Sequence, residues 1–284
     1  MANNIWSDVS SIANSIQEDA YFIVRETATM QNLVTVFRDL NGMNPRVGYK
    51  YNSMTANAIS DADDLTSQSF TPSADQTLTP AEIGAQFFVT DARADSDLPE
   101  NIISDGAREL GFAANDKIET DLLGDMASLT GGTVGGSGSA ITWSYVSAAI
   151  AQARYVNKST SVPLVFVMHG YQWAVLAKSA SIAGASVAPA PGFQEEITRT
   201  GWVARYMGVD LYQVMGGISG TDFYGGVFPR NSLAFDVRRA IRVEPERDAS
   251  RRGYEFNMSA IYAHGVWRPA LGISTLFAAT APTS

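Results

Sequence analysis

One long amphipathic helix constrains the fold of this chain more than any other feature of its sequence. The stretch "SDLPENIISDGARELGFAANDKIETDLLGDM" opens with Asp97 and Glu100 in a capping-box-like arrangement, with Pro99 in the first turn. Apolar side chains then recur every three or four positions, at Ile103, Ala107, Leu110, Ala114, Ile118, Leu122 and Met126. The pattern predicts a helix over residues 98–126, about 43 Å long. Because its apolar stripe is narrow, we expect it to lie across a sheet.

A long strand near the C-terminus matches that helix in length. From residue 254 to residue 267, apolar and aromatic residues alternate with polar ones, which predicts a strand of about 45 Å. Both elements are far longer than the globular average, so they predict an elongated domain. Elongated shapes expose much surface for their size and normally belong to assemblies.

The region before the helix has too little apolar material to make a core of its own. Residues 5–42 are expected to be mainly helical, and residues 47–91 are rich in Thr, Ser, Ala and Asp until Phe87. This composition predicts a long two-stranded excursion with a polar tip. We expect such an arm to be stabilised by another surface, often another copy of the chain.

The second half alternates helices and strands. "TGGTVGGSGSA", residues 130–140, indicates a flexible linker that separates the chain into two parts. Beyond it the patterns predict helices over 143–156, 171–179 and 194–207, and strands over 163–168, in "VDLYQVM" and through "FYGGVFPRNSLAFDV".

The net charge of −9 is unevenly distributed, with 14 acids and five bases in residues 1–100. Sequence-independent nucleic-acid binding needs a positive field, which the chain lacks overall. The one basic concentration comprises Arg238, Arg239, Arg242, Arg247, Arg251 and Arg252. Glu244, Glu246 and Asp248 interleave with it, so we expect an interstrand or intersubunit ion-pair network rather than a phosphate groove.

No constellation of residues points to catalysis. The chain has no Cys, and its two histidines, His169 and His264, do not form a zinc motif. Asp61, Asp63 and Asp64 lack the Gly and Glu of a calcium loop. Nucleotide-binding and GxSxG motifs are also absent from the sequence. We therefore predict no catalytic residue, no cofactor-binding residue, no metal ligand and no enzyme activity.

His169 follows a predicted strand and precedes a predicted helix, at the kind of corner where enzymes place nucleophiles. No Ser, Cys or Thr stands beside it, and adjacent carboxylates such as Glu195 and Glu196 point to different sides of a helix. We expect His169 to be a hydrogen-bonding turn residue. Trp173, Trp202 and Trp267 could line a cleft for a carbohydrate or receptor, although aromatic residues at such periodicities more often pack in a core or an interface.

Two absences in the sequence concern the membrane and secretion. No run approaches the roughly 18 apolar residues of a membrane-spanning helix. The N-terminus lacks the basic and apolar regions of a secretory signal. We expect no membrane partner, and folding in the cytosol.

The order of elements resembles a known family. Four segments show the resemblance: "FFVTDARADSDLPENIISDGARELGFAANDKIETDLL", "VPLVFVMHGYQWAVLAK", "GWVARYMGVDLYQV" and "NMSAIYAHGVWRPALGIST". Together they resemble the major capsid protein of tailed bacteriophages, the Hong Kong 97-type fold that encapsulin shells also use. The resemblance implies an α+β chain with an N-terminal arm (1–44), an extended β E-loop (45–91), a P-domain spine helix and linker (92–140), the rest of the P-domain with a mixed α/β A-domain (141–253), and a long P-domain strand with the C-terminal segment (254–284).

The resemblance also implies a function and partners. The chain would be a structural head protein whose pentamers and hexamers form an icosahedral shell around phage DNA, without sequence-specific DNA binding. It would be assembled in the host cytoplasm and located in the virion. Its partners would be a separate scaffolding protein (unless the chain is already processed), a portal and, as an option, a decoration protein. The alternatives are an encapsulin-type nanocompartment and, from another class, the carbohydrate- or receptor-binding module.

Two residue-level points accompany the resemblance. Some members of the family crosslink a Lys to an Asn, and Lys50 is the only Lys in the expected E-loop, but the sequence does not assign it that role. We also expect Asp61, Asp63 and Asp64 to meet the Arg238–Arg252 cluster of a neighbouring subunit.

Overall fold

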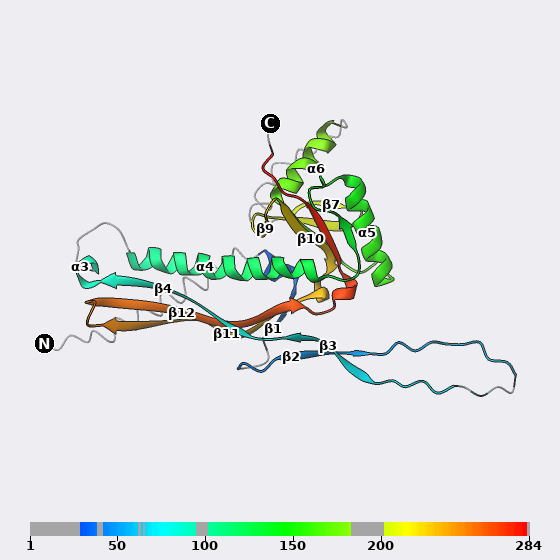
Figure 1. Ribbon diagram of the computed structural model, residues 1–284, viewed down its shortest axis with the longest axis horizontal. Helices are drawn as coiled ribbons and strands as arrows, with labels where there is room; N and C mark the ends of the chain where they lie inside the picture. The colour runs from blue at the N-terminus through cyan, green and yellow to red at the C-terminus, as the bar shows by residue number, and fades with distance from the viewer. Residues whose placement is uncertain are drawn as a thin grey trace.

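The chain forms an α+β fold with an elongated part, a compact part and a projecting arm (Figure 1). This computed structural model describes residues 29–38, 42–61, 64, 66–94, 102–182 and 202–282. The predicted helical segment 5–42 and the Glu195–Glu196 pair therefore lie largely or wholly outside the described residues. No described helix is both long and apolar enough to span a membrane.

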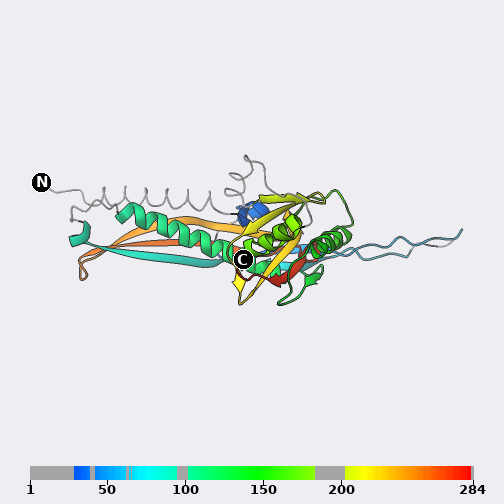
Figure 2. The same cartoon turned by 90° about the horizontal axis from the view of Figure 1, so that it is seen from above.

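The elongated part is one helix on one sheet. The four strands follow the order β1-β11-β12-β4, with β1 parallel to β11 and the other pairs antiparallel. Their bounds are Thr35–Phe37 (β1), Leu233–Asp248 (β11), Gly253–Val266 (β12) and Ala81–Thr90 (β4). Helix α4, Ile102–Gly124, continues as a 3-10 helix, Asp125–Ser128, and packs on β4 and β12 (Figure 2). The predicted long strand and the described portion of the predicted long helix are confirmed.

The apolar periodicities explain why this helix and this sheet meet. On α4, Leu110, Ala114, Ile118 and Leu122 are buried, which is the stripe predicted from the sequence. On β12, Phe256, Met258, Ala260 and Tyr262 are buried on the same face of the sheet. Each large side chain buried there contributes roughly 1.5–3 kcal/mol. The contact is close enough that a Cβ on Gly106 would lie 2.7 Å from the Phe87 ring.

The arm is an antiparallel ribbon of β2, Arg46–Tyr51, and β3, Pro72–Leu78, that extends away from the rest of the molecule (Figure 1). The two-stranded excursion predicted here is confirmed. The range 45–91 expected for it also contains β4, which is a full member of the four-stranded sheet.

The compact part is a seven-stranded mixed sheet in the order β5-β13-β10-β6-β8-β7, with β9 paired to β10. Its strands are Thr133–Gly135 (β5), Leu164–His169 (β6), Trp202–Tyr206 (β7), Val209–Val214 (β8), Ile218–Ser219 (β9), Asp222–Pro229 (β10) and Ile273–Ala278 (β13). Helices α5, Trp143–Asn157, and α6, Gly170–Ile182, accompany it. The remaining short elements are α2 (Met30–Leu33), α3 (Asp91–Ala94) and the 3-10 turns Arg230–Ser232 and Pro269–Leu271. Fully buried Phe166, Leu211 and Phe277 form part of its core with Val146 and Ile150 of α5.

Two predictions for this part are wrong. The helix expected over 194–207 is, within its described residues, strand β7, which forms a hairpin with β8. Met207 and Gly208 make the turn at φ 49° and 77°, as a two-residue hairpin of the favoured twist requires. The linker expected over 130–140 contains β5, which pairs in parallel with β13 and so belongs to the sheet.

Candidate functional site

Charged groups fasten the base of the arm to the four-stranded sheet. Arg46 Nε, at the start of β2, lies 2.7 Å from Asp236 Oδ2 on β11. The same carboxylate oxygen lies 2.8 Å from a terminal nitrogen of Arg238, and the side chains of Asp236 and Arg238 are fully buried. Buried charges persist only when they are paired, so this cluster specifies where the arm meets the body.

Aromatic rings surround the same junction. The Arg46 guanidinium lies 4.3 Å from the centre of the Phe37 ring, and Phe37 meets Trp267 edge-on at 5.3 Å. The indole of Trp267 covers Gly48, where an added Cβ would lie 3.0 Å from it. Trp267 is thus a packing residue of the arm base. A pocket of about 610 Å³ adjoins this junction, and Lys50 is among the residues that line it.

The arm beyond its base exposes large apolar side chains. Tyr49, Tyr51, Met54, Ile59 and Phe70 are each more than half exposed, with Tyr49 reaching 66%. Tyr51 and Phe70 stack on one another at 4.8 Å, but no layer of the described chain covers the pair. Exposed apolar surface of this kind marks a protein interaction site.

The arginine cluster forms ion pairs within the chain. Arg239 pairs with Glu82, Arg242 with Glu244, Arg247 with Asp91 and Arg251 with Glu255. The Arg239–Glu82 pair joins β11 to β4 and the Arg247–Asp91 pair joins β11 to the start of α3, as expected of an interstrand network. The Arg242–Glu244 pair lies within β11, and Arg251 in the β11–β12 turn pairs with Glu255 at the start of β12. The contact expected between this cluster and arm acids of a neighbour remains a prediction; Asp61 and Asp64 lie in the exposed tip region of the arm, and Asp63 lies outside the described residues.

His169 is engaged at both ring nitrogens. Its Nδ1 accepts a hydrogen bond from the Tyr171 amide at 3.1 Å, and its Nε2 lies 3.2 Å from the Met215 carbonyl oxygen, to which it can donate. Burial lowers the pKa of the imidazole, and the bond to Met215 only partly opposes this effect. Gln172 completes the corner by accepting from the His169 amide. The geometry is that of a turn residue, as the sequence predicts.

His264 belongs to a polar cluster between α4 and β12 that the sequence analysis missed. Its Nδ1 lies 2.9 Å from Asp125 Oδ2, and the Tyr262 hydroxyl donates to Asp121 Oδ2 at 2.6 Å. Lys117 also donates to Asp121. The signal was available: these acids and Lys117 recur every four residues on the helix, and the two aromatic residues alternate on the strand. The cluster ties the helix to the strand.

The protonation of this cluster depends on burial and mutual contact. The hydrogen bond with Asp125 raises the pKa of His264. Burial raises the pKa of Asp125, and it also raises that of Tyr262. Burial opposes charge on Asp121 too, but hydrogen bonds from Lys117 and Tyr262 bring its pKa below the usual value. Among the described residues, no group of three or more potential ligands could hold a metal ion.

A second contact ties α2 to α4. Both carboxylate oxygens of Glu119 accept the Met30 amide hydrogen, at 3.1 and 3.2 Å. Burial raises the pKa of Glu119 to about 7, despite that bond. The contact fixes where α2 meets the long helix.

Trp173 and Trp267, two of the three tryptophans for which the sequence also allowed a cleft, lie in different parts of the molecule. Trp173 packs edge-on against Trp143 in the compact part, whereas Trp267 lies at the arm base. Trp202 is the first residue of β7, and its side chain lies outside what the structure describes. The arrangement therefore gives no support to a carbohydrate- or receptor-binding site built from these three residues.

The arm, the elongated body and the compact sheet together define a class of fold found in viral shells. A capsid structure of cyanophage P-SCSP1u matches with a TM-score of 0.67 at 13% identity, covering 90% of this chain and 89% of that chain. A structure from Mycobacterium phage Che8 matches at 0.66 and 16% identity, covering 88% and 91%. A virus-like particle from Pyrococcus furiosus matches at 0.61 and 10% identity, covering 92% and 98%. At these identities the likeness shows the fold, and it confirms the capsid fold expected from the resemblance.

The sequence itself identifies the family. Residues 74–273 match the family described as phage capsid protein, whereas no curated protein matches the chain. The chain therefore belongs to the phage capsid protein family. Its function is that of a structural major capsid protein of the phage virion, assembled from many copies of itself.

Proposed function

We propose that this chain forms pentamers and hexamers that close an icosahedral shell around phage DNA, with each arm lying on a neighbouring subunit. The observation that supports the proposal is the arm itself, whose large apolar side chains are exposed beyond a base fixed by Arg46 and Asp236. A two-stranded ribbon is only marginally stable alone, so a neighbouring surface has to complete it. The exposed Tyr51–Phe70 stack is the contact such a neighbour would cover.

The proposal assigns a role to each segment of the chain and names the partners of the assembled subunit. Regionally, residues 1–44 act as the N-terminal arm, 45–91 as the E-loop, 92–140 as spine helix and linker, 141–253 as the rest of the P-domain and the A-domain, and 254–284 as the long strand and C-terminal segment. Molecularly, the subunits assemble in the host cytoplasm with a separate scaffolding protein and a portal, and a decoration protein can bind outside. The protein is not an enzyme and requires no cofactor or metal.

Electrostatics support confinement of DNA rather than sequence-specific binding. The chain carries a net charge of −9, and the described pairs of the arginine cluster are to carboxylates of the same chain. Repulsion between an acidic shell and the packaged polyanion keeps DNA from adhering to the wall. An encapsulin-type compartment is the alternative, because the resemblance implies the same fold for both kinds of shell.

Light scattering behind size exclusion, with negative-stain images of the leading fraction, tests the assembly. We expect hollow shells, or rings of five and six subunits, from the chain expressed together with the proteins of its own gene neighbourhood. Only monomers from that co-expression would contradict the proposal. The contents of purified shells separate the alternatives, because DNA supports the phage head and a packaged enzyme supports the compartment.

A further inference from the structure

The two edges of the four-stranded sheet differ in how well they are protected from pairing with another chain. Beyond its short pairing with β1, strand β11 forms one edge, and its register with β12 shifts twice between Val237 and Arg242. Pro245 lies within the same strand, and the side chains of Glu244 and Glu246 are exposed. Bulges, prolines and charges of this kind keep an edge strand from pairing.

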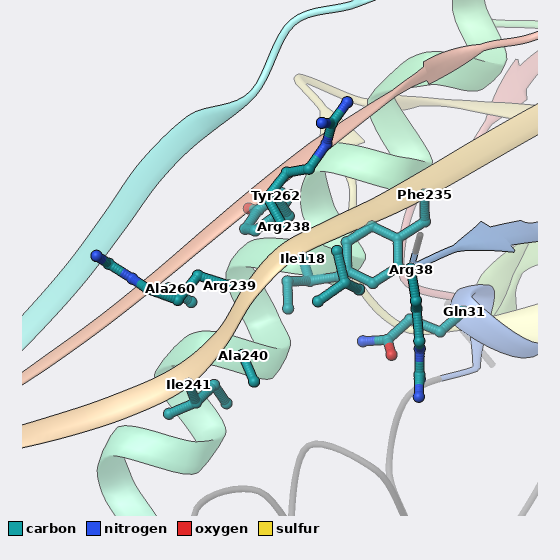
Figure 3. A pocket seen from close by; sticks show the side chains of 11 residues that line it. Gln31, Arg38, Ile118, Phe235, Arg238, Arg239, Ala240, Ile241, Ala260 and Tyr262 are labelled. Atoms are coloured by element: carbon teal, nitrogen blue, oxygen red, sulfur yellow. The ribbon is translucent and has the colours of Figure 1, made fainter. Parts of the chain in front are cut away.

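The pocket beside the β11 edge is closed by the chain's own side chains. It has a volume of about 260 Å³ and lies between α4 and β11. Figure 3 shows that Ile118 and Phe235, two of the residues that line it, point toward one another. Ile118, Phe235 and Ile241 are at most 6% exposed, so they offer no open apolar surface to another chain.

Strand β4 forms the opposite edge and carries none of these protective features. Its ten residues pair with β12 in an unbroken register, and none of them is Pro. Glu82 is its one charged residue, and that carboxylate is paired with Arg239. Gly84 and Gln86 are exposed, and no segment of the described chain pairs with the outer side of β4 (Figure 2). A long, regular edge of this kind is a template for a further strand.

The apolar layer under α4 is also incomplete at β4. On β12, Phe256 and Met258 are at most 4% exposed. Their partners in register on β4 are Phe87 and Ala85, which pack against the same core but are only partly buried. A further strand beside β4 would complete the burial of these two side chains.

The outer half of the arm has unpaired backbone as well. The ladder between β2 and β3 ends at the pair of Tyr51 and Pro72, and in Figure 1 the two segments continue beyond it side by side. The amide and carbonyl of Thr55 are bonded to the side chain of Gln68, at 2.9 and 2.6 Å. No backbone–backbone hydrogen bond among the described residues joins the two segments there. The exposed residues 52–60 therefore have backbone groups available for pairing.

The two edges of residues 52–60 can be told apart. In an extended strand the N–H and C=O of one residue point to the same side, and those of the next residue point to the opposite side. Because the backbone groups of Thr55 point to the return segment, those of Met54, Ala56 and Ala58 point away from it. Polar and apolar residues alternate from Ser53 to Ala58, so the side chains of these three residues share one face.

We propose that residues 52–60 of one subunit's arm add as a fifth strand to the outer edge of β4 in a neighbouring copy. Nine extended residues span about 30 Å, close to the roughly 33 Å of β4. Met54, Ala56 and Ala58 then extend the apolar layer beside Phe87. The arm of the same chain cannot fill this place, because it projects from the body in the direction opposite to β4 (Figure 1). This inference rests on the proposed function, in which each arm lies on a neighbour, and it names the surface that receives the arm.

Engineered disulfides test the contact, and the chain offers a clean background because it has no Cys. Gln86→Cys, on the face of β4 away from α4, is combined with Ser53→Cys, Thr55→Cys or Asn57→Cys, one pair at a time. The matched control replaces Gln86→Cys by Glu246→Cys, an exposed residue of the protected edge. Each full chain is co-expressed with its natural assembly partners. Disulfides require Cα atoms within about 7 Å, so only paired strands are linked efficiently.

In purified shells we expect at least one of the three pairs to link chains into covalent oligomers, and the Glu246 controls to stay unlinked. Covalent dimers from Gln86→Cys alone would mean that two copies of β4 meet, and would overturn the proposal. Complete shells without a link from any of the three pairs would overturn it while leaving the shell proposal intact. Absence of shells from the natural chain would overturn both.

A pair of proline variants gives a second readout that needs no disulfide. Ala56→Pro removes an N–H that points away from the return segment, whereas Asn57→Pro removes one that points toward it. Neither N–H belongs to the β2–β3 ladder, so both free subunits should unfold at the urea concentration of the natural chain. We expect Ala56→Pro to lower the shell yield at least about fivefold, the factor that one lost backbone hydrogen bond implies. Equal shell yields from the two variants would contradict the pairing.

Discussion

The compact part and the elongated part of this molecule are held together in different ways. The core of the compact part is aromatic and aliphatic, with Phe166 and Phe277 fully buried against α5. The elongated part buries apolar residues too, but it also fixes its layers with titratable groups: Asp236 at the arm base, Glu119 under α2 and the His264 cluster on α4. One helix on one sheet makes a thin layer, so polar contacts at fixed points determine how its pieces are aligned.

The geometry of the subunit is specified mainly by the polar contacts of the elongated part. Apolar packing is non-directional and tolerates repacking, whereas a paired buried charge fixes one arrangement. We infer that the compact part supplies stability and that the polar contacts of the elongated part set the direction of the arm and the helix. Four variants, in order of decreasing expected change in the free energy of unfolding, test whether the two parts differ in this way.

The largest loss should come from the compact core. Phe166→Ala removes a fully buried ring and leaves a cavity, which should lower the free energy of unfolding by about 4 kcal/mol. Urea denaturation followed by circular dichroism measures the change. A loss below about 1 kcal/mol would show that this core does not carry the stability of the compact part.

A slightly smaller loss of the free energy of unfolding is expected for a substitution at the arm base. Asp236→Ala leaves Arg46 and Arg238 without their shared carboxylate, which should cost about 3 kcal/mol and increase hydrogen exchange at the base of the arm. The matched control is Asp91→Ala, which breaks the exposed pair with Arg247 and should leave stability nearly unchanged. Equal effects of the two variants would contradict the special role of the buried cluster.

Replacing Glu119 by Gln should raise the free energy of unfolding, by an amount that depends on pH. Burial raises the pKa of this carboxyl from 4.5 to about 7, so the folded state binds its proton more tightly than the unfolded state does. Stability should therefore fall as pH rises from about 4.5 to about 7. Glu119→Gln imitates the protonated side chain, so the variant should be more stable by about 3 kcal/mol at pH 8 and equal to the natural chain near pH 4.5. A variant less stable than the natural chain at pH 8 would refute this assignment.

The smallest expected effect concerns His264. Its pKa is raised by Asp125, so its contribution is fully present below its unfolded pKa near 6.5 and is lost as pH rises through the folded value. His264→Gln should destabilise the protein at pH 6, with the difference from the natural chain shrinking toward pH 9. Lys117 and Asp121 also face this imidazole and stay in place in the variant. Thermal unfolding of both proteins from pH 6 to pH 9 measures this stability difference. A difference that stays constant with pH would contradict the prediction.

The sequence predicted the elements that depend on local periodicity. The buried stripe of α4, the alternation in β12 and the apolar run of β6 could each be predicted locally. In each element the spacing of the apolar residues matches the face that is buried in the structure. Strand β7 was missed because its identity comes from pairing with β8 through the Met207–Gly208 turn. Gly208 directly after "VARYM" was the signal that could have indicated a hairpin.

The contacts that position the arm could not be predicted in the same way. Arg46 and Asp236 are 190 residues apart, and nothing local pairs them. The only hint was an acid inside the apolar run "SLAFDV", because a buried carboxylate requires a partner. The resemblance to capsid proteins supplied the architecture, but the particular residues that fix the arm emerged only from the folded chain.

The role of the arm in assembly is tested most directly by comparing the natural chain with the double variant Tyr51→Ala, Phe70→Ala. The control is Asn52→Ala combined with Ser67→Ala, which changes exposed polar residues of the same arm. Each protein is co-expressed with its natural assembly partners and measured by light scattering and negative-stain imaging, with urea unfolding of the free subunit alongside. We expect closed shells for the natural chain and the control, and free subunits of nearly unchanged stability for the aromatic variant. Shells of normal yield from the aromatic variant would contradict the claim that the arm joins one subunit to the next.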